Sequence, residues 1–208
     1  MRQETITTNI YTFGELTEDI QEKVIQNNYD YNTQYEYYNF EIDCWKEHLD
    51  CIGFEDSKIY FSGFCSQGDG ASFESDIDIE KIFSCFVYNE TDYKQIKDFE
   101  KLLNLMDKGL LEFSFWSKRT SSHYYHENTC TIDHEINLYF KNCSAQAENW
   151  FYETVEEIRD TIENLRHKLS QTIYHGLRDQ HEYLQSEEAI SESFYINEIE
   201  FTKDGKFY

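Results

Sequence analysis

A long run of apolar residues with helical spacing constrains the fold of this chain more than any other feature. Between Gln146 and Leu184, apolar side chains recur at intervals of three and four residues over three heptads. Residues with this spacing share one face of a helix, which packs across a sheet or pairs with a second helix. Gly176 is where we expect this helix to bend or end. The positions concerned are Phe151, Val155, Ile158, Ile162, Leu165, Leu169 and Thr172 or Ile173.

Two segments alternate apolar and polar residues, as strands with one buried face do. They cover 110–118 and 129–141, and the polar loop between them predicts a hairpin. A second hairpin is expected where a strand over 58–65 meets the turn Ser66–Gly70 and a returning strand over 71–74. The other expected strands are 5–13, 193–201 and, after a tight turn, 206–208.

The expected helices lie between these strands without regular βαβ repetition. This order predicts an α+β fold, with a mainly antiparallel sheet, helices packed on one face, and one long helix in the C-terminal half. The chain contains no proline, and no segment has the composition of a linker. We therefore expect one compact acidic domain over 1–208. The remaining expected helices are 17–28, 31–50, 79–86 and 92–106.

The charge of the chain restricts its partners. Forty-one acidic residues against 18 basic ones give a formal net charge of -23. Direct binding to nucleic acid or to an anionic membrane needs a positive face, so a basic protein surface is the expected partner. An acidic protein whose charge has no binding role is the alternative. No apolar run approaches 18 residues, so we expect no membrane span and a cytoplasmic protein. In that compartment the six cysteines are expected to be reduced and mostly buried.

One group of acidic residues follows from the predicted helix 31–50. Tyr31, Tyr35, Tyr38, Ile42, Trp45 and Leu49 form its apolar seam. Four acids lie on the opposite side and would make an exposed row about 21 Å long. These acids are Glu36, Asp43, Glu47 and Asp50.

A second acidic group alternates along the predicted strand that follows the turn. Glu74, Asp76, Asp78 and Glu80 would share one side of that strand. A divalent cation needs oxygen ligands converging from several segments, so a solvated acidic face is the better interpretation. Asp69 lies in the glycine-rich turn, which lacks the lysine of a phosphate-binding loop. We interpret that turn as a structural hairpin or a contact loop for another protein.

Catalytic chemistry finds little support in the sequence. His123, His126, Cys130 and His134 would form a metal-binding face on a helix. Their segment has the pattern of a loop and a strand, on which only Cys130 and His134 share a side. No motif for a nucleophile is present. We therefore expect no catalytic residue, no metal and no cofactor.

The glycine-rich turn also carries a resemblance. The segment Ile59–Phe73 resembles a block in small proteins of bacteriophages and prophages, although Cys65 stands where that block usually has an aromatic residue or serine. The segments Tyr11–Leu16 and Asn197–Lys206 look like the same group. Automatic labels often describe such proteins as antitoxins of toxin–antitoxin stability systems. The resemblance implies a phage or mobile-element origin and assigns no functional residue.

Together these observations favour a non-enzymatic, phage-type inhibitor in the bacterial host cytoplasm. It would bind and block a basic, nucleic-acid-binding host defence protein. Nucleic-acid mimicry of the anti-CRISPR or anti-restriction type is one way to do so. One alternative is an antitoxin-like or self-assembling module, a homo-oligomer that uses the helix 146–184. A metal-dependent enzyme using the His/Cys group is another. The expected contacts are Glu36, Asp43, Glu47, Asp50, Asp69, Glu74, Asp76 and Asp78.

Overall fold

The computed structural model describes residues 7–90, 93–139 and 144–208, without the side chains of 86–90 and 93–96. The chain forms two compact units, and each is described by itself below. The first unit combines Met1–Asn39 with Leu177–Tyr208, and the second is Phe40–Gly176. The expectation that residues 1–208 form one domain, which would include both units, stays a prediction.

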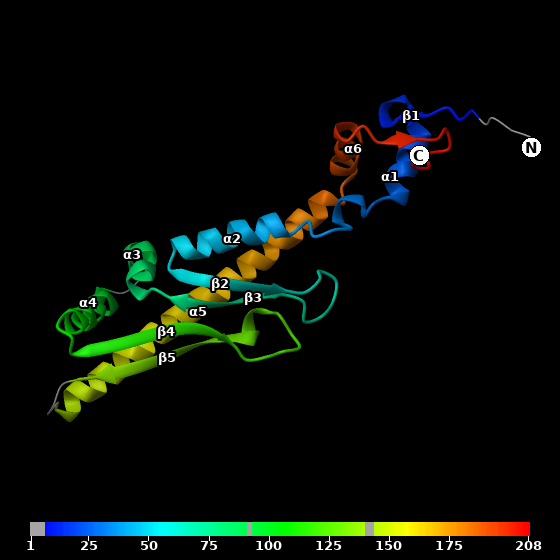
Figure 1. Ribbon diagram of the computed structural model, residues 1–208. Coiled ribbons are helices and arrows are strands. Elements are labelled where there is room, and N and C mark those ends of the chain that lie inside the picture. The colour runs from blue at the N-terminus through cyan, green and yellow to red at the C-terminus, as the bar shows by residue number, and fades with distance from the viewer. Residues whose placement is uncertain (1–6, 91–92, 140–143) are drawn as a thin grey trace, which may run out of the picture. The chain divides into compact units, whose positions relative to one another are not determined.

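The second unit contains an antiparallel four-stranded sheet in the order β2-β3-β4-β5 (Figure 1). Both predicted hairpins are confirmed, because β2 pairs with β3 and β4 pairs with β5. The last strand ends earlier than expected, and residues 140 and 141 lie outside the described part of the chain. The strands are β2 (Phe54–Phe61), β3 (Ala71–Ile77), β4 (Leu111–Arg119) and β5 (Cys130–Leu138).

Helices complete the α+β fold of this unit. The longest, α5 (Ala145–Leu184), confirms the long helix predicted from the apolar spacing. It does not end at Gly176. A Cβ atom at this position would lie 3.2 Å from the Trp45 ring, which is closer than ordinary van der Waals contact, so glycine lets the ring pack tightly against the helix. The other helices are α2 (Asn39–Cys51), α3 (Ile79–Glu90), α4 (Tyr93–Asp107) and the short 3-10 helix η3 (Glu127–Thr129).

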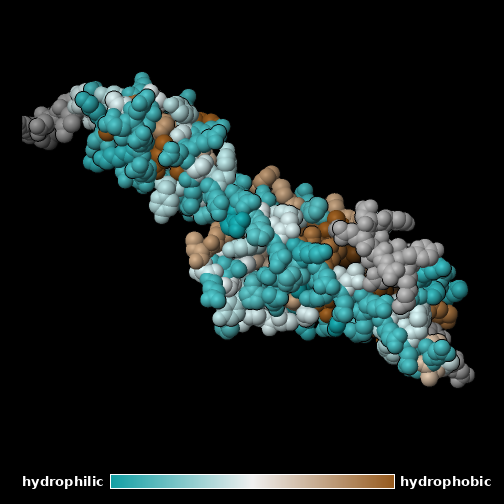
Figure 2. Space-filling model, turned by 180° about the vertical axis from the view of Figure 1, so that it is seen from behind, coloured by the Kyte–Doolittle hydropathy of each residue, from teal (hydrophilic) through white to brown (hydrophobic). Residues whose placement is uncertain are grey.

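The apolar core lies between α5 and one face of the sheet. Ile158 and Ile162 of α5 are fully buried, as is Phe73 of β3. The carboxylate of Glu163 accepts a hydrogen bond from the Ile132 backbone N–H at 2.7 Å, which ties the helix to β5. Figure 1 shows α5 behind the sheet and no helix in front of it. Figure 2 shows the unit from the α5 side, where hydrophilic residues predominate.

The prediction of one helix over 31–50 is wrong in its first half. Tyr31–Thr33 form the 3-10 helix η2, and α2 begins only at Asn39. Asparagine, threonine and tyrosine are weak helix formers, and polar side chains here bond to the backbone instead. The hydroxyl of Thr33 donates to the Asp30 carbonyl at 3.1 Å, and Asn32 donates to the Leu184 carbonyl at 3.1 Å.

The first unit packs its elements around an aromatic core. Phe13, Phe194 and Phe201 are buried together, and Tyr31 lies edge-on to Phe194 with ring centres 4.9 Å apart. The strands β1 and β6 form an antiparallel pair. The elements are β1 (Tyr11–Thr12), η1 (Phe13–Glu15), α1 (Glu18–Asn27), η2, α6 (Glu187–Ile196) and β6 (Glu200–Phe201).

The predicted strand 193–201 is wrong in its first part, because residues 193–196 are the last turn of a helix. The side chain of Ser186 accepts a hydrogen bond from the Ala189 backbone N–H, and this cap starts α6, which continues to Ile196. Only Glu200 and Phe201 are extended. The terminal turn is confirmed, because the Thr202 backbone N–H donates to the Lys206 carbonyl at 2.8 Å. Of the strand predicted over 5–13, Tyr11–Thr12 is extended, and 1–6 lie outside the described residues.

Two further expectations concern membrane spans and cysteines. Among the described residues, no helix is both long enough and apolar enough to cross a bilayer. The described cysteines are free thiols, and Cys143 lies outside the described residues. The expectation that most are buried is wrong, because Cys44, Cys51, Cys65 and Cys85 are exposed. Cys130 is buried, and burial raises the pKa of its thiol.

Candidate protein-binding surface

The sheet face opposite α5 carries a row of aligned side chains across all four strands. Asp76 of β3 pairs with Glu55 of β2 on one side and with Trp116 of β4 on the other. Trp116 in turn pairs with Asp133 of β5. Side chains of directly paired residues point to the same face of a sheet, about 5 Å apart. We call Glu55, Asp76, Trp116 and Asp133 the acidic row.

The two ends of the acidic row are partly neutralised, and its centre is not. Lys81 Nζ lies 3.5 Å from Glu55 Oε1, and Lys118 Nζ lies 3.7 Å from Asp133 Oδ2. Asp76 is exposed, and none of the residues whose side chains the structure describes makes a hydrogen bond or an ion pair with its carboxylate. The negative charge at Asp76, beside the Trp116 ring, is therefore the part of the row most open to a cation.

Other acids on this face outnumber its lysines. The acidic side chains that follow the same alternation as the row are Glu74 on β3, Glu112 on β4 and Glu135 on β5. The matching lysines are Lys58 and Lys118. The face as a whole therefore presents a negative field to an approaching molecule.

The carboxylate of Glu74 accepts two hydrogen bonds within the protein. The Tyr60 hydroxyl donates to Oε2 at 2.6 Å and the Arg119 backbone N–H donates to Oε1 at 3.1 Å. The Tyr60 hydrogen bond lowers the pKa of Glu74 below its ordinary value, although burial acts the other way. The Arg119 guanidinium carbon lies 4.5 Å from the centres of both the Tyr60 and Tyr125 rings. Glu74 thus helps to join β3 to the end of β4.

Asp69 and Asp78 also have structural tasks. Asp69 Oδ2 accepts hydrogen bonds from the backbone N–H groups of Cys65 at 3.0 Å and Ser66 at 2.6 Å, which closes the β2–β3 turn. Asp78 Oδ1 accepts from the Lys81 backbone N–H at 3.0 Å, at the start of α3. The strand acids expected on one side are therefore divided, because β3 ends at Ile77.

The acids predicted on helix 31–50 are divided as well. Asp43, Glu47 and Asp50 all lie on α2 and all are exposed, as expected. Lys46 pairs with Asp43 at 2.9 Å. Glu36 precedes the helix and belongs to the first unit, where its carboxylate accepts a hydrogen bond from the Asn39 side chain at 2.9 Å. The prediction that four acids form an exposed row on one helix is therefore wrong for Glu36 and confirmed for the other three.

The histidine and cysteine group does not gather into a metal site. Among the described residues, no cluster of three or more His, Cys, Asp or Glu side chains could hold a metal ion. His126 Nδ1 accepts a hydrogen bond from the Asn128 backbone N–H at 3.3 Å. The His134 ring stacks on Phe115 with ring centres 5.2 Å apart. Cys130 and His134 do share one side of β5, as the alternation predicted.

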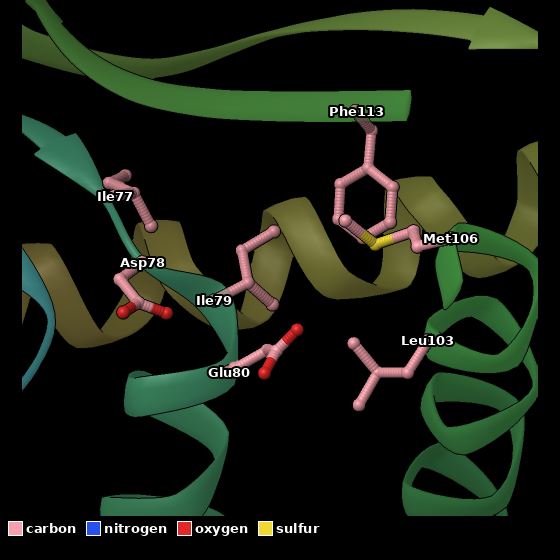
Figure 3. A pocket seen from close by; sticks show the side chains of 7 residues that line it. All are labelled: Ile77, Asp78, Ile79, Glu80, Leu103, Met106 and Phe113. Carbon is pink, nitrogen blue, oxygen red and sulfur yellow. The ribbon is translucent and has the colours of Figure 1, made fainter. Parts of the chain in front are cut away.

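A cavity lies where β3 passes into α3. It has a volume of about 390 Å³. Figure 3 shows Phe113 of β4 beside Met106 of α4, with Ile79 and Leu103 facing the same space. The Glu80 carboxylate points toward the space between α3 and α4. The lining residues are Ile77, Asp78, Ile79, Glu80, Leu103, Met106 and Phe113.

Sequence reasoning missed both the acidic row and the cavity. It selected Asp76, and it left out Glu55, Trp116 and Asp133. The alternation of apolar and polar residues in the two hairpins indicates which side chains share a face. It does not show the bulge between Glu55 and Lys58, which shifts the pairing register of β2 with β3. Glu80 was placed on the strand, whereas it belongs to the first turn of α3.

A family model described as a domain of unknown function (DUF8835) matches residues 37–187. The matched span contains the whole second unit, with the sheet, the acidic row and the cavity. Comparison with curated proteins finds no match, and comparison with solved structures finds none.

Proposed function

The chain belongs to the DUF8835 family of unknown function, and we propose from its surface that it is a binding protein that docks on a basic surface of another protein. The observation that carries this proposal is the acidic row. Three carboxylates flank one indole in register across a sheet face that α5 leaves uncovered. The sheet supplies a rigid base, so these groups are held in place before a partner arrives.

The chemistry of the row fits lysine and arginine side chains. A carboxylate attracts a cation, and an indole face attracts a cation as well. Tryptophan is also among the residues that most often dominate the free energy of protein–protein binding. Because Asp76 and Trp116 are adjacent, one cationic side chain can contact both groups.

In its specific form, the proposal is a phage-type inhibitor of a host defence protein that binds nucleic acid. Such proteins carry lysine and arginine surfaces for the phosphate backbone, which an acidic protein can occupy. The net charge of -23 and the phage-like segment Ile59–Phe73 support this form. The proposal places the protein in the bacterial host cytoplasm, without a catalytic role.

The alternative, a module that assembles through α5, has less support. Its apolar seam is used inside the second unit, where Val155, Ile158 and Ile162 are buried. A partner helix would have to bind another side of α5. We therefore favour the sheet face over the helix seam as the binding surface.

Capture from a bacterial lysate tests the proposal. The tagged protein, the variant Asp76→Lys and the matched control Glu192→Lys are compared, with washes at low and high salt and mass spectrometry of the bound proteins. Asp76 and Glu192 are both exposed, so neither substitution should change stability by more than about 0.5 kcal/mol.

We expect a basic, nucleic-acid-binding protein that the wild type and Glu192→Lys retain at low salt and release at high salt. The Asp76→Lys variant should retain at least tenfold less of this protein, because its new lysine would face the lysine and arginine side chains of the partner. Equal retention by all three proteins would show that the acidic row is not the binding surface. A bait that captures nothing would contradict the proposal itself.

A further inference from the structure

The cavity beside α3 combines an apolar floor with an acidic rim. Its apolar side chains come from four elements: the end of β3, the start of α3, one side of α4, and the start of β4. Leu103, Met106 and Phe113 are only partly buried. Covering these side chains would remove apolar surface from water, which favours an apolar occupant.

The size of the cavity fits a side chain or a small ligand. Its volume of about 390 Å³ lies at the lower end of the range for ligand pockets in proteins. Methionine has three rotatable bonds and a polarisable sulfur, so Met106 can adjust to occupants of different shape. The cavity is therefore suited to a leucine, phenylalanine or similar group.

The acidic rim of the cavity favours a molecule that carries a cationic group next to its apolar group. Glu80 is exposed, and no lysine or arginine among the described side chains pairs with it. Asp78 already uses Oδ1 to hold the start of α3, and Lys81 is engaged with Glu55. The carboxylate of Glu80 is therefore the rim charge that a cationic group of an incoming molecule would meet.

The cavity and the acidic row lie on opposite faces of the sheet and are neighbours only at the end of β3. Asp76 points to the open face, whereas the next residue, Ile77, pairs with Phe115 and belongs with Phe113 to the face toward α5. A segment that passes around the end of β3 could contact both. The row would receive its cationic side chains, and the cavity would receive an apolar one.

We propose that the cavity binds an apolar side chain from a lysine- or arginine-rich segment of the partner protein. The proposal rests on the proposed function and names the kind of partner segment. Charge complementarity favours this occupant over a second copy of the chain, because a second copy carries 41 acidic residues against 18 basic ones.

Methyl NMR can observe the cavity directly. The chain has two methionines, Met1 and Met106, and Met106 lines the cavity. In protein labelled uniformly with 15N and with [methyl-13C]methionine, the Met106 signal therefore reports occupancy. Backbone amide signals of the same sample report binding on the acidic row.

Three synthetic peptides serve as probes. The first has a leucine between two pairs of lysines, the second has glycine in place of the leucine, and the third has serines in place of the lysines. The first should move the Met106 signal and bind roughly tenfold more tightly than the glycine peptide, because a leucine side chain becomes buried. The serine peptide should leave the signal unmoved over the same concentration range.

Two variants sharpen the test. Leu103→Trp fills the cavity with a larger side chain at a partly exposed position, and it should reduce binding of the leucine peptide to the level of the glycine peptide. Glu80→Gln removes the rim charge and should weaken the leucine peptide about threefold. Neither variant should alter binding of the glycine peptide to the acidic row by more than about twofold.

The outcomes separate this inference from the proposed function. If lysine peptides shift the amides of the acidic row but leave Met106 unmoved, the cavity is not the binding site and the proposed function stands. Equal Met106 shifts with the leucine and serine peptides would remove the role of the rim charge and overturn the inference. If no peptide shifts any signal at millimolar concentration, both proposals fail.

Discussion

The two faces of the four-stranded sheet differ in almost every property, although they are built from alternate residues of the same strands. The face toward α5 buries Phe73, Phe115 and Ile132. The opposite face presents Asp76 and Trp116 at positions one residue away from that core. The side chains that stabilise the fold and those proposed to bind a partner therefore come from the same strands and differ in the face to which they point. Mutation should be able to change stability without changing binding, and the reverse.

The largest effect should come from the buried face. Phe73→Ala removes a fully buried ring that packs edge-on to Phe54, with ring centres 5.2 Å apart. We expect a loss of about 3–5 kcal/mol in the free energy of unfolding. Asp76→Ala should change it by less than about 0.5 kcal/mol. Urea unfolding followed by circular dichroism measures both, and similar losses for the two variants would break the comparison.

The next effect concerns a charge on the buried side. Arg166 is fully buried, and it donates to Glu163 Oε1 at 2.6 Å and to the Glu127 carbonyl at 2.9 Å. Glu163→Ala removes the partner of a buried cation, so we expect a loss of about 2–3 kcal/mol.

The matched control for this prediction is Glu153→Ala, an exposed position on the same helix. It should cost less than about 0.5 kcal/mol. Thermal unfolding of the two variants gives the comparison. A Glu163→Ala protein as stable as Glu153→Ala would show that the Arg166 contact contributes nothing to the buried side.

The carboxylate of Glu74 should contribute to the stability of the fold, although it lies on the open face. Its pKa in the folded state is lowered, chiefly by the Tyr60 hydrogen bond. A lowered pKa adds stability above the ordinary glutamate value, and this stability is lost as pH falls through the folded-state pKa. Glu74→Gln should flatten the pH dependence of unfolding in that acidic window. Tyr60→Phe should flatten the same window, and an unchanged profile in both variants would contradict the role of the hydrogen bond.

The smallest effect is expected at the end of the acidic row. Lys118 and Asp133 are both about half exposed and their charged atoms are 3.7 Å apart. Lys118→Ala should change the free energy of unfolding by less than about 0.5 kcal/mol. It should also make the face more negative and raise its affinity for a lysine peptide about twofold. Isothermal titration measures this affinity, and a decrease would show that Lys118 itself contacts the partner.

Periodicity made much of this fold predictable. The spacing of Val155, Ile158 and Ile162 predicted α5, because a continuous apolar stripe on a helix needs a surface to cover. Alternation predicted both hairpins. Periodicity failed in the segment from Tyr31 to Tyr38, where the spacing of tyrosines is helical and the backbone is not. Side chain–backbone hydrogen bonds determine the backbone conformation of that segment, and the spacing of apolar residues does not predict such bonds.

The candidate binding surface was predictable only in part. Exposure of Asp43 and Asp76 followed from the pattern, but the alignment of Asp76 with Trp116 depends on the pairing of β3 with β4. These strands are joined through two helices rather than a turn, so no local signal sets their register. The cavity depends on the packing of α4 against β4, which is likewise a matter of tertiary structure.

The most direct test of the open face uses the three tryptophans as reporters. Trp116 lies in the acidic row, whereas Trp45 lies on α2 beside Gly176 and Trp150 lies on α5 beside Lys101. In protein with 15N-labelled indoles, a lysine-rich peptide should shift the Trp116 signal and leave the other two in place. A peptide that binds while the Trp116 signal stays unmoved would contradict the assignment of this face as the partner-binding surface.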